Sequence, residues 1–491
     1  MTGFKTLRAL LITSMSAFAL AACGGGADNV ASPGEGAFPP GTGGGGGTGG
    51  GGGGGGTAAT DCPAGFANVG TIANGTLRAC QLPSKIVGNL VVPARAGTAY
   101  SISGRVDVGD DRGADPNSPI PGSQQGILTI EPGVRLYGSG GLDYINVQRG
   151  NQIFAEGTAS NPIIFTSRQN LEGQTGEDSI GQWGGIVISG RAPIASCPAG
   201  TTPPNINCVA TFEGGVALYG GNSPTDNSGR LRYVQVRFPG FEVQPNRELN
   251  GITLNGVGSG TTIEYVQVHN SSDDGIEFFG GTVNARYLVM TGIDDDSIDT
   301  DEGWRGGIQF LIARQRANGG DRVFEMSSAG VQSALNSRPM IANYTAIGSG
   351  RTGAGDVQIL NTGTGGRFMN GIHVSANPAT ACLDVDTAST VAAAPRWDSV
   401  VLACATAFRN DSDVDGAAAQ TLFNAGTNNV ANHTSTLNGF VNGANEAARP
   451  AFNASTVSSF FVNTSYIGAV RDANDTWWQG WTCGLASGSS C

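Results

Sequence analysis

Acidic residues recur at a constant step in the middle of the chain. Three of them, Asp273, Asp274 and Glu277, are each followed 22 residues later by another, namely Asp295, Asp296 and Asp299. If 22 residues make one turn of a stacked structure, each pair lies about 4.8 Å apart. Carboxylates that close raise one another's pKa or recruit a cation, and Ca²⁺ prefers oxygen ligands of this kind. These six residues are therefore a candidate calcium site.

Two other roles suit the same residues. Aspartate side chains accept hydrogen bonds from backbone amides at tight corners between strands, which would make the repeat purely structural. Two carboxylates on adjacent turns could also act as acid and base in the cleavage of a glycosidic bond. Corner capping, calcium binding and catalysis all remain open on the sequence alone.

A second acidic motif lies nearer the C-terminus. Asp411, Asp413 and Asp415 alternate and are followed by Gly416, which matches the first half of a calcium loop. The twelfth position is Leu422, where an EF-hand carries a bidentate glutamate. The motif therefore predicts a weaker calcium loop or a plain acidic turn.

The elements that must position these residues are short strands in a repeat. Gly251-Ile-Thr-Leu, Gly275-Ile-Glu-Phe and Ser297-Ile-Asp-Thr begin successive units, and Gly corners separate the apolar runs. Units of this length that bury an apolar face against their neighbours indicate a solenoid. With 79 glycines and only 13% charged residues, the composition favours strands and tight turns over amphipathic helices. We expect an all-β, right-handed parallel β-helix with capped ends and a less regular C-terminal region.

Composition shifts divide the chain into expected segments. A Gly-rich stretch that cannot bury apolar area should be a tether, and the first and last turns of a solenoid need caps. The expected segments are a signal peptide (1–22), a tether (23–59), an N-terminal cap (60–125), a β-helix (126–375) with an inserted loop (191–228), and C-terminal rungs with a cap (376–491).

The N-terminus resembles that of a bacterial lipoprotein. Lys5 and Arg8 precede a short apolar run, and Leu20-Ala-Ala-Cys23 is similar to the lipobox, in which the cysteine is acylated. The resemblance implies that Cys23 carries the lipid, palmitate included. Because Gly24 follows rather than aspartate, it also implies anchoring in the outer membrane, on its surface-exposed or its periplasmic face.

Eight further cysteines fit an exported protein. They fall as neighbours in sequence, and in an oxidising compartment each pair would close a small loop. The chain has no Cys-x-x-Cys spacing, and its three histidines are dispersed, so a zinc site is not expected. The expected disulfides are Cys62–Cys80, Cys197–Cys208, Cys382–Cys404 and Cys483–Cys491.

Three tryptophans, Trp477, Trp478 and Trp481, lie within five residues near the C-terminus. Such a cluster could form a platform on which a ligand stacks. The interpretation that the sequence favours is a plug that closes the open end of the last coil.

The run from Val266 to Gly281, together with Asp294 to Trp304, resembles a family of outer-membrane and surface lipoproteins of Gram-negative bacteria, most without an assigned activity. The likeness extends from about Gly126 to Ile312 and includes Thr476-Trp-Trp-Gln-Gly-Trp-Thr-Cys. It implies a β-helix fold and a place in the cell envelope, and it carries no catalytic residues. Ser272-Asp-Asp-Gly-Ile is also faintly similar to the double-aspartate motif of polygalacturonases, whose other signatures are missing.

A net charge of −12 disfavours nucleic acid as a partner and favours the binding of cations. We therefore expect a lipid-anchored envelope protein that binds or scaffolds at the cell surface, with a polysaccharide or an envelope protein as partner and Ca²⁺ as cofactor. The alternative is a polysaccharide lyase or glycoside hydrolase that uses the stacked carboxylates.

Overall fold

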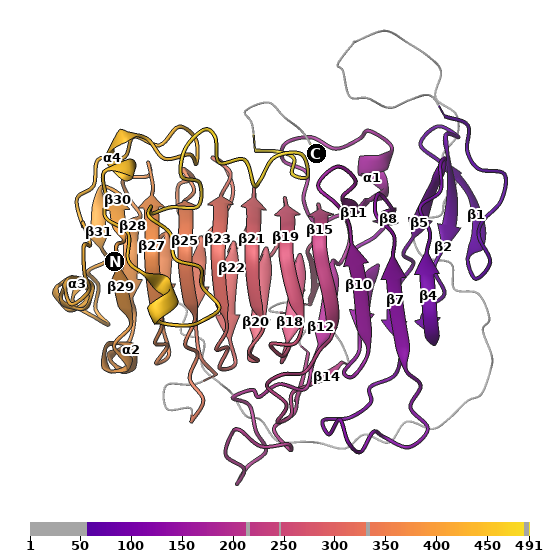
Figure 1. The fold of residues 1–491 in the computed structure, drawn as a ribbon, viewed down its shortest axis with the longest axis horizontal. Coiled ribbons are helices and arrows are strands. Elements are labelled where there is room, and N and C mark those ends of the chain that lie inside the picture. The colour runs from indigo at the N-terminus through magenta and orange to yellow at the C-terminus, as the bar shows by residue number, and fades with distance from the viewer. Residues whose placement is uncertain (1–55, 213–216, 245–246, 330–333, 486–490) are drawn as a thin grey trace, which may run out of the picture. The chain divides into compact units, whose positions relative to one another are not determined.

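The computed structural model describes residues 56–212, 217–244, 247–329, 334–485 and 491. The expected signal peptide, the expected acylation site Cys23 and residues 24–55 of the expected tether lie outside this range. Two long sheets contain most of the strands (Figure 1). No described helix is long and apolar enough to cross a bilayer.

The larger sheet, sheet A, has 16 strands, and all of its pairs are parallel except that of β1 with β2. Its strands are β1 (Ala67–Ile72), β2 (Leu77–Gln81), β4 (Gly88–Val92), β5 (Thr98–Ser101), β7 (Gly126–Ile130), β8 (Arg135–Gly138), β10 (Gln152–Glu156), β11 (Ile163–Ser167), β15 (Gly229–Arg237), β19 (Thr262–His269), β21 (Asn284–Thr291), β23 (Gly307–Arg314), β25 (Met340–Ile347), β27 (Arg367–Val374), β29 (Arg396–Asp398) and β30 (Val401–Ala403).

The smaller sheet, sheet B, has 11 parallel strands, which alternate along the chain with those of sheet A. They are β3 (Lys85–Ile86), β6 (Arg105–Val108), β9 (Tyr144–Val147), β12 (Ile186–Ser189), β18 (Ile252–Asn255), β20 (Ile276–Phe279), β22 (Ile298–Asp301), β24 (Phe324–Met326), β26 (Gln358–Leu360), β28 (Ala381–Val385) and β31 (Thr406–Phe408). In the N-terminal coils two strands of sheet A precede each strand of sheet B, and in the middle coils one long strand does. The chain thus returns to both sheets in every coil, and the fold is the expected parallel β-helix.

The remaining elements are short. Two antiparallel hairpins, β13–β14 and β16–β17, lie outside the long sheets. Their strands are β13 (Ala210–Thr211), β14 (Leu218–Tyr219), β16 (Phe241–Gln244) and β17 (Arg247–Leu249), and the helices are α1 (Arg168–Leu171), α2 (Ala388–Ala393), α3 (Gly416–Asn424), α4 (Ala444–Ala447) and a 3₁₀ turn (Ala454–Thr456).

Side-chain alternation explains the core. In β7, Leu128 and Ile130 point inward and are buried, whereas the residues between them are partly exposed. Equivalent inward positions on successive coils form one continuous apolar cluster from Phe66 to Phe423. Each coil therefore buries its apolar side chains against the next, as a solenoid requires.

In the middle coils, a bend divides each long strand of sheet A. Strand β15 pairs with β10 along its first half and with β11 along its second half, so two separate strands have merged into one. The bend residues Tyr233, Tyr265 and Tyr287 have positive φ angles of 50°, 55° and 59°. This left-handed backbone is unfavourable for a non-glycine residue, and the rings offset its cost by stacking with centroids 4.4 Å apart.

The C-terminal strap, residues 434–485, crosses the outer face of sheet A towards earlier coils, as the yellow chain in Figure 1 shows. Amide side chains on the sheet hold its backbone. Asn370 Oδ1 accepts a hydrogen bond from the Phe452 amide (2.7 Å), and Gln309 Oε1 accepts one from the Val462 amide (2.9 Å). Gln267 Oε1 accepts a third, from the Cys483 amide (3.0 Å).

The interpretation of the tryptophans as an end plug is wrong. Trp481 is buried edge-on against Tyr233 and Tyr265, and Trp477 packs on Tyr287, so both cover the tyrosine stack in the middle of the helix. The strap carries them to this position, where the bends of sheet A present the stacked tyrosines.

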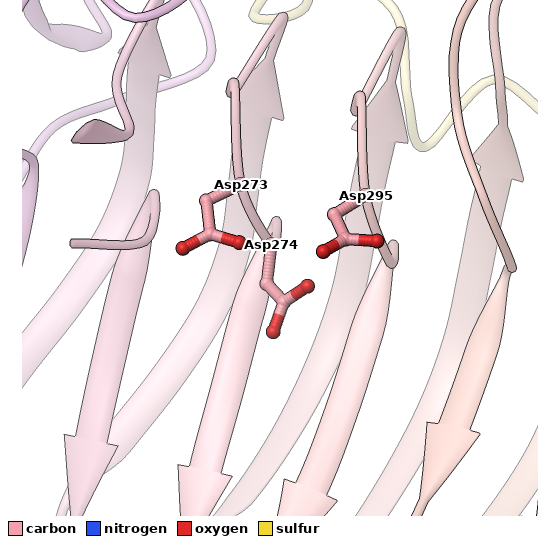
Figure 2. Close-up of side chains that lie close together, drawn as sticks. All are labelled: Asp273, Asp274 and Asp295. Atoms are coloured by element: carbon pink, nitrogen blue, oxygen red, sulfur yellow. The ribbon is translucent and has the colours of Figure 1, made fainter. Parts of the chain in front are cut away.

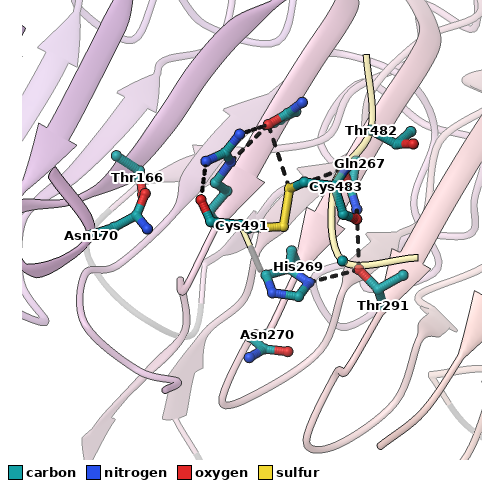
Figure 3. The surroundings of a disulfide bond; sticks show 12 residues. Thr166, Asn170, Gln267, His269, Asn270, Thr291, Thr482, Cys483 and Cys491 are labelled. Carbon is teal, nitrogen blue, oxygen red and sulfur yellow. Dashed lines mark hydrogen bonds between the residues drawn. A yellow bond between two sulfur atoms is a disulfide. The ribbon is translucent and has the colours of Figure 1, made fainter. Parts of the chain in front are cut away.

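All four expected disulfides are present: Cys62–Cys80, Cys197–Cys208, Cys382–Cys404 and Cys483–Cys491. The last holds the end of the strap beside His269, whose Nδ1 hydrogen bonds to Thr291 Oγ1 at 2.9 Å (Figure 3).

Replacing Trp481 with alanine should destabilise the protein, because it removes a buried indole and uncovers the tyrosine stack. Losses of about 3–5 kcal/mol are typical of buried tryptophans. Urea unfolding of Trp481→Ala measures the loss, with Val462→Ala, an exposed position in the same strap, as control. Equal unfolding free energies for the two variants would contradict the described role of the strap.

Candidate metal centre

The acidic residues lie where the chain turns into sheet B. Asp273 and Asp274 precede β20, Asp295 and Asp296 precede β22, and Asp321 precedes β24. Because the sheet is parallel, these corners stack on one another. We call them, together with the carboxylates of the strands that follow, the acidic ladder.

The strand pairing confirms the predicted register. Glu277 on β20 lies opposite Asp299 on β22, and Asp299 lies opposite Glu325 on β24. Their neighbours, such as Ile276 and Ile298, are buried in the core. Since side chains alternate between the faces of a strand, the three carboxylates form a row on the outer face of sheet B.

The carboxylates come together in three overlapping groups, within each of which oxygens of all members lie within 4.8 Å of one another. The first, in Figure 2, joins Asp273 and Asp274 of one corner to Asp295 of the next. Asp274 and Asp295 also belong to other groups, so the network is continuous over three coils. The other two groups are Asp274, Glu277 and Asp299, and Asp295, Asp296 and Asp321.

Corner capping accounts for part of each carboxylate. Asp274 Oδ1 accepts a hydrogen bond from the Asp296 amide at 3.0 Å, and Asp296 Oδ1 accepts one from the Arg322 amide at 2.8 Å. One oxygen of each aspartate therefore caps the following coil. The capping role expected from the sequence is therefore present, but it accounts for only one oxygen of each of these two carboxylates.

Burial makes negative charge costly here. Asp274 and Asp296 are only 6% and 4% exposed. Burial, and then the neighbouring carboxylates, raise the pKa of Asp274 and that of Asp296 well above their usual value. The same causes raise the pKa of Asp295 to about 6, and burial is the main cause that raises the pKa of Asp301 to about 7.

Basic residues neutralise only one side of the ladder. Arg322 forms ion pairs with Asp321 and Glu325, and Arg316 pairs with Asp294. Among the described residues, no arginine, lysine or histidine lies within ion-pair distance of Asp274, Asp295 or Asp299. Oδ1 of Asp299 is moreover buried without a hydrogen-bond partner. This part of the ladder has the donor set of a cation site, and a proton or a metal ion would relieve its charge.

The second predicted motif does not converge as a calcium loop. The Asp413 amide donates to Asp411 Oδ1 at 3.0 Å, and Asp415 caps α3 by accepting from the Ala417 amide at 2.9 Å. Asp411 instead groups with two residues of another coil, Asp384 and Asp386. The interpretation of the three alternating aspartates as one ligand set is therefore corrected, and Asp413 and Asp415 serve the turn and the helix.

Asp321, Glu325, Asp384 and Asp386 were missed because the period changes. From Asp295 to Asp321 and from Asp299 to Glu325 the step is 26 residues, four more than in the preceding coil. A signal was present: Ile276-Glu-Phe, Ile298-Asp-Thr and Phe324-Glu-Met share an acidic residue after the first apolar one. A search by strand pattern, with loops of variable length, would have found Glu325.

Comparison with known proteins identifies the family. The model of the pectate-lyase-like β-helix domain matches residues 118–482, which is more than half of the chain, and the chain belongs to this family. No curated protein and no solved structure matches the chain.

The ladder predicts an unusual pH dependence of stability without a cation. Carboxyls whose pKa is raised in the folded state bind more protons folded than unfolded, so stability is highest at low pH and falls as pH rises. From the shifts of Asp295 and Asp301, the fall should extend from the ordinary value of 3.8 to about 7. We expect the Tm in EDTA to fall across this window. Ca²⁺ at about 5 mM, which exceeds the Kd of about 0.1–1 mM typical of extracellular calcium sites, should cancel the fall. A Tm in EDTA that is constant or rises over the window would be inconsistent with this account.

Proposed function

We propose that this member of the pectate-lyase-like β-helix family is a lipid-anchored protein of the bacterial outer membrane that binds a polysaccharide through Ca²⁺ held on the acidic ladder. The observation that carries the proposal is the group formed by Asp273, Asp274 and Asp295. Its carboxylates come from two coils, and two of its members, Asp274 and Asp295, have no basic partner in the described part of the chain.

The spacing of the group suits calcium. Two oxygens that bind one ion lie no farther apart than twice the metal–oxygen distance, which for Ca²⁺ at 2.3–2.6 Å is about 4.6–5.2 Å. The group fits this limit, since its oxygens lie within 4.8 Å of one another. Mg²⁺ needs shorter distances and near-ideal octahedral geometry. Oxygen ligands alone, without sulfur or imidazole, also favour a hard cation.

A cation at this place could bind a glycan directly. Asp295 and Asp299 are partly exposed, whereas Asp273 and Asp274 are buried. An ion held by the buried carboxylates would thus have one side towards solvent. Hydroxyl or carboxylate oxygens of a polysaccharide would complete its coordination, and the net negative charge of the protein would otherwise repel an acidic glycan.

The charge state of the basic residues favours a binding role over cleavage of the polysaccharide by a lyase, which needs a base for β-elimination. Burial lowers the pKa of Arg322, but Asp296, Glu325 and Asp321 raise it above its usual value, so this residue stays charged and is no base. Arg316 is paired with Asp294, and Lys85 lies on β3 and is paired with Asp110. None of these three basic residues has the character of a proton-abstracting base.

Glycoside hydrolysis is the second candidate, supported by one observation. Burial raises the pKa of Asp301 to about 7, which would let this residue hold a proton at neutral pH as a general acid does. A hydrolase releases new reducing ends from its polysaccharide, whereas a binding protein does not.

Anchoring rests on the N-terminal motif. A lipid on Cys23 would place the β-helix at the membrane, and residues 24–59 would act as its tether. The partner would then be an envelope or extracellular polysaccharide. The strongly acidic chain disfavours nucleic acid.

The variant Asp274→Asn tests the cation site without breaking the corner, because the asparagine oxygen can still accept the Asp296 amide. We expect calorimetric titration to show Ca²⁺ binding by the wild type and at least tenfold weaker binding by Asp274→Asn. Retention on a panel of acidic and neutral polysaccharides should be lost in the same variant and in EDTA. Asp413→Asn, an exposed turn position, is the matched control.

Two outcomes would count against the proposal. Unchanged Ca²⁺ binding in Asp274→Asn would remove the ladder from the site. Release of reducing ends by the wild type, lost in Asp301→Asn, would replace binding by hydrolysis.

A further inference from the structure

A cavity of about 340 Å³ lies on coils that precede the acidic ladder. It is lined by the turn between β4 and β5, the turn between β7 and β8, and Asn161 just before β11. This is the corner at which the tyrosines stack in later coils. The cavity and the corners that lead into sheet B are therefore two different corners of the coil, separated by one strand of sheet A.

Arg135 is an unneutralised charge in this cavity. It is half-buried on β8, and burial alone lowers its pKa. In the described part of the chain, no carboxylate lies within ion-pair distance of its guanidinium, and no hydrogen bond from this group is present. Partly desolvating a charge without a partner is unfavourable. Arg135 therefore either lowers the stability of the protein without a benefit or is present to bind a ligand.

Thr98 is a second unsatisfied group in the same wall. The residue is only 5% exposed, and its hydroxyl oxygen is buried without a hydrogen-bond partner. Buried hydroxyls are normally hydrogen-bonded, so this oxygen is an unsatisfied polar atom in a residue that lines the cavity. The adjacent Tyr100 is not free in this sense, because its hydroxyl donates to the Pro93 carbonyl at 2.7 Å.

The cavity has one unpaired positive charge in its lining, which suits a ligand with a single negative charge. Arg95 also lines it, but its guanidinium is already paired with Asp61. Among the residues that line the cavity, Arg135 thus carries the one charge without an ion-pair partner, and the carboxylate of Glu131, which accepts the Ala94 amide at 2.8 Å, lies beside the cavity. Arg237, two strands along sheet A, adds to the positive field: its pKa falls to about 10, chiefly through burial and then through the charge of Arg135.

We propose that this cavity binds the carboxylate of one acidic sugar residue, with Arg135 as its ion-pair partner. A planar guanidinium holds a carboxylate through two parallel hydrogen bonds. The cavity volume is at the lower end of the range for small-molecule sites, about 300–1,000 Å³, which suits a single ring. The apolar residues Pro132 and Val134 also line the cavity, where they could pack against the faces of the sugar ring.

The choice of a sugar acid rests on the proposed polysaccharide-binding function, whereas the choice of a monoanion rests on the cavity itself. The site needs no metal ion, since its charge is positive. Its binding should persist in EDTA, under which binding through the acidic ladder is lost. The two sites can therefore fail independently.

The test is calorimetric titration of the full-length protein in EDTA with glucuronate, glucose and inorganic phosphate. We expect saturable binding of glucuronate, no binding of glucose and weaker binding of phosphate. Arg135→Gln should weaken glucuronate binding at least tenfold. Arg230→Gln, an exposed arginine on β15, is the matched control and should leave the affinity unchanged.

A stability measurement separates a ligand site from a structural role. Because Arg135 has no partner, Arg135→Met should raise the Tm of the ligand-free protein, whereas a structural arginine would lower it. A lower Tm would overturn the proposal. So would glucose binding as tight as that of glucuronate, phosphate binding tighter than that of glucuronate, or glucuronate binding unaffected by Arg135→Gln.

Discussion

Parallel stacking at one strand spacing is the constraint on which this structure depends. Each coil places its residues about 4.8 Å from their equivalents in the next, so a preference at one position is repeated along the axis. Apolar positions become a continuous core, and tyrosines at the bends become a stack of rings. Carboxylates at the corners become a row of like charges, which only protons or a cation can relieve.

Different parts of the outer surface of the coils have different roles. The strap and its tryptophans cover the aromatic part of sheet A, and the hairpin of β13 and β14 packs against Val187 and Phe279 of sheet B. What remains are two sites of opposite charge, the acidic ladder and the cavity at Arg135. An acidic polysaccharide could use both, through a bridging cation at one and a direct ion pair at the other.

Features that recur with the 22-residue repeat could be predicted from the sequence, whereas features outside this repeat could not. The step of 22 residues gave the fold and the pairing of Glu277 with Asp299, because local alternation and stacking determine both. Asp321 and Glu325 escaped because a longer loop changes the step. The tryptophans were misplaced because the strap docks through single side chains, such as Gln267 and Asn370, whose contacts leave no periodic signal. The sequence left a calcium loop and a plain turn open for Asp415, because a helix cap and a calcium loop begin alike.

The most direct test of a cation on the ladder is anomalous diffraction from crystals grown with Ca²⁺ and, in a second set, soaked with a lanthanide that replaces it. The account predicts one anomalous peak among the carboxylates of Asp273, Asp274 and Asp295, within about 2.3–2.6 Å of their oxygens for Ca²⁺. Density without a peak there, with these carboxyl groups instead sharing protons through short hydrogen bonds, would contradict it.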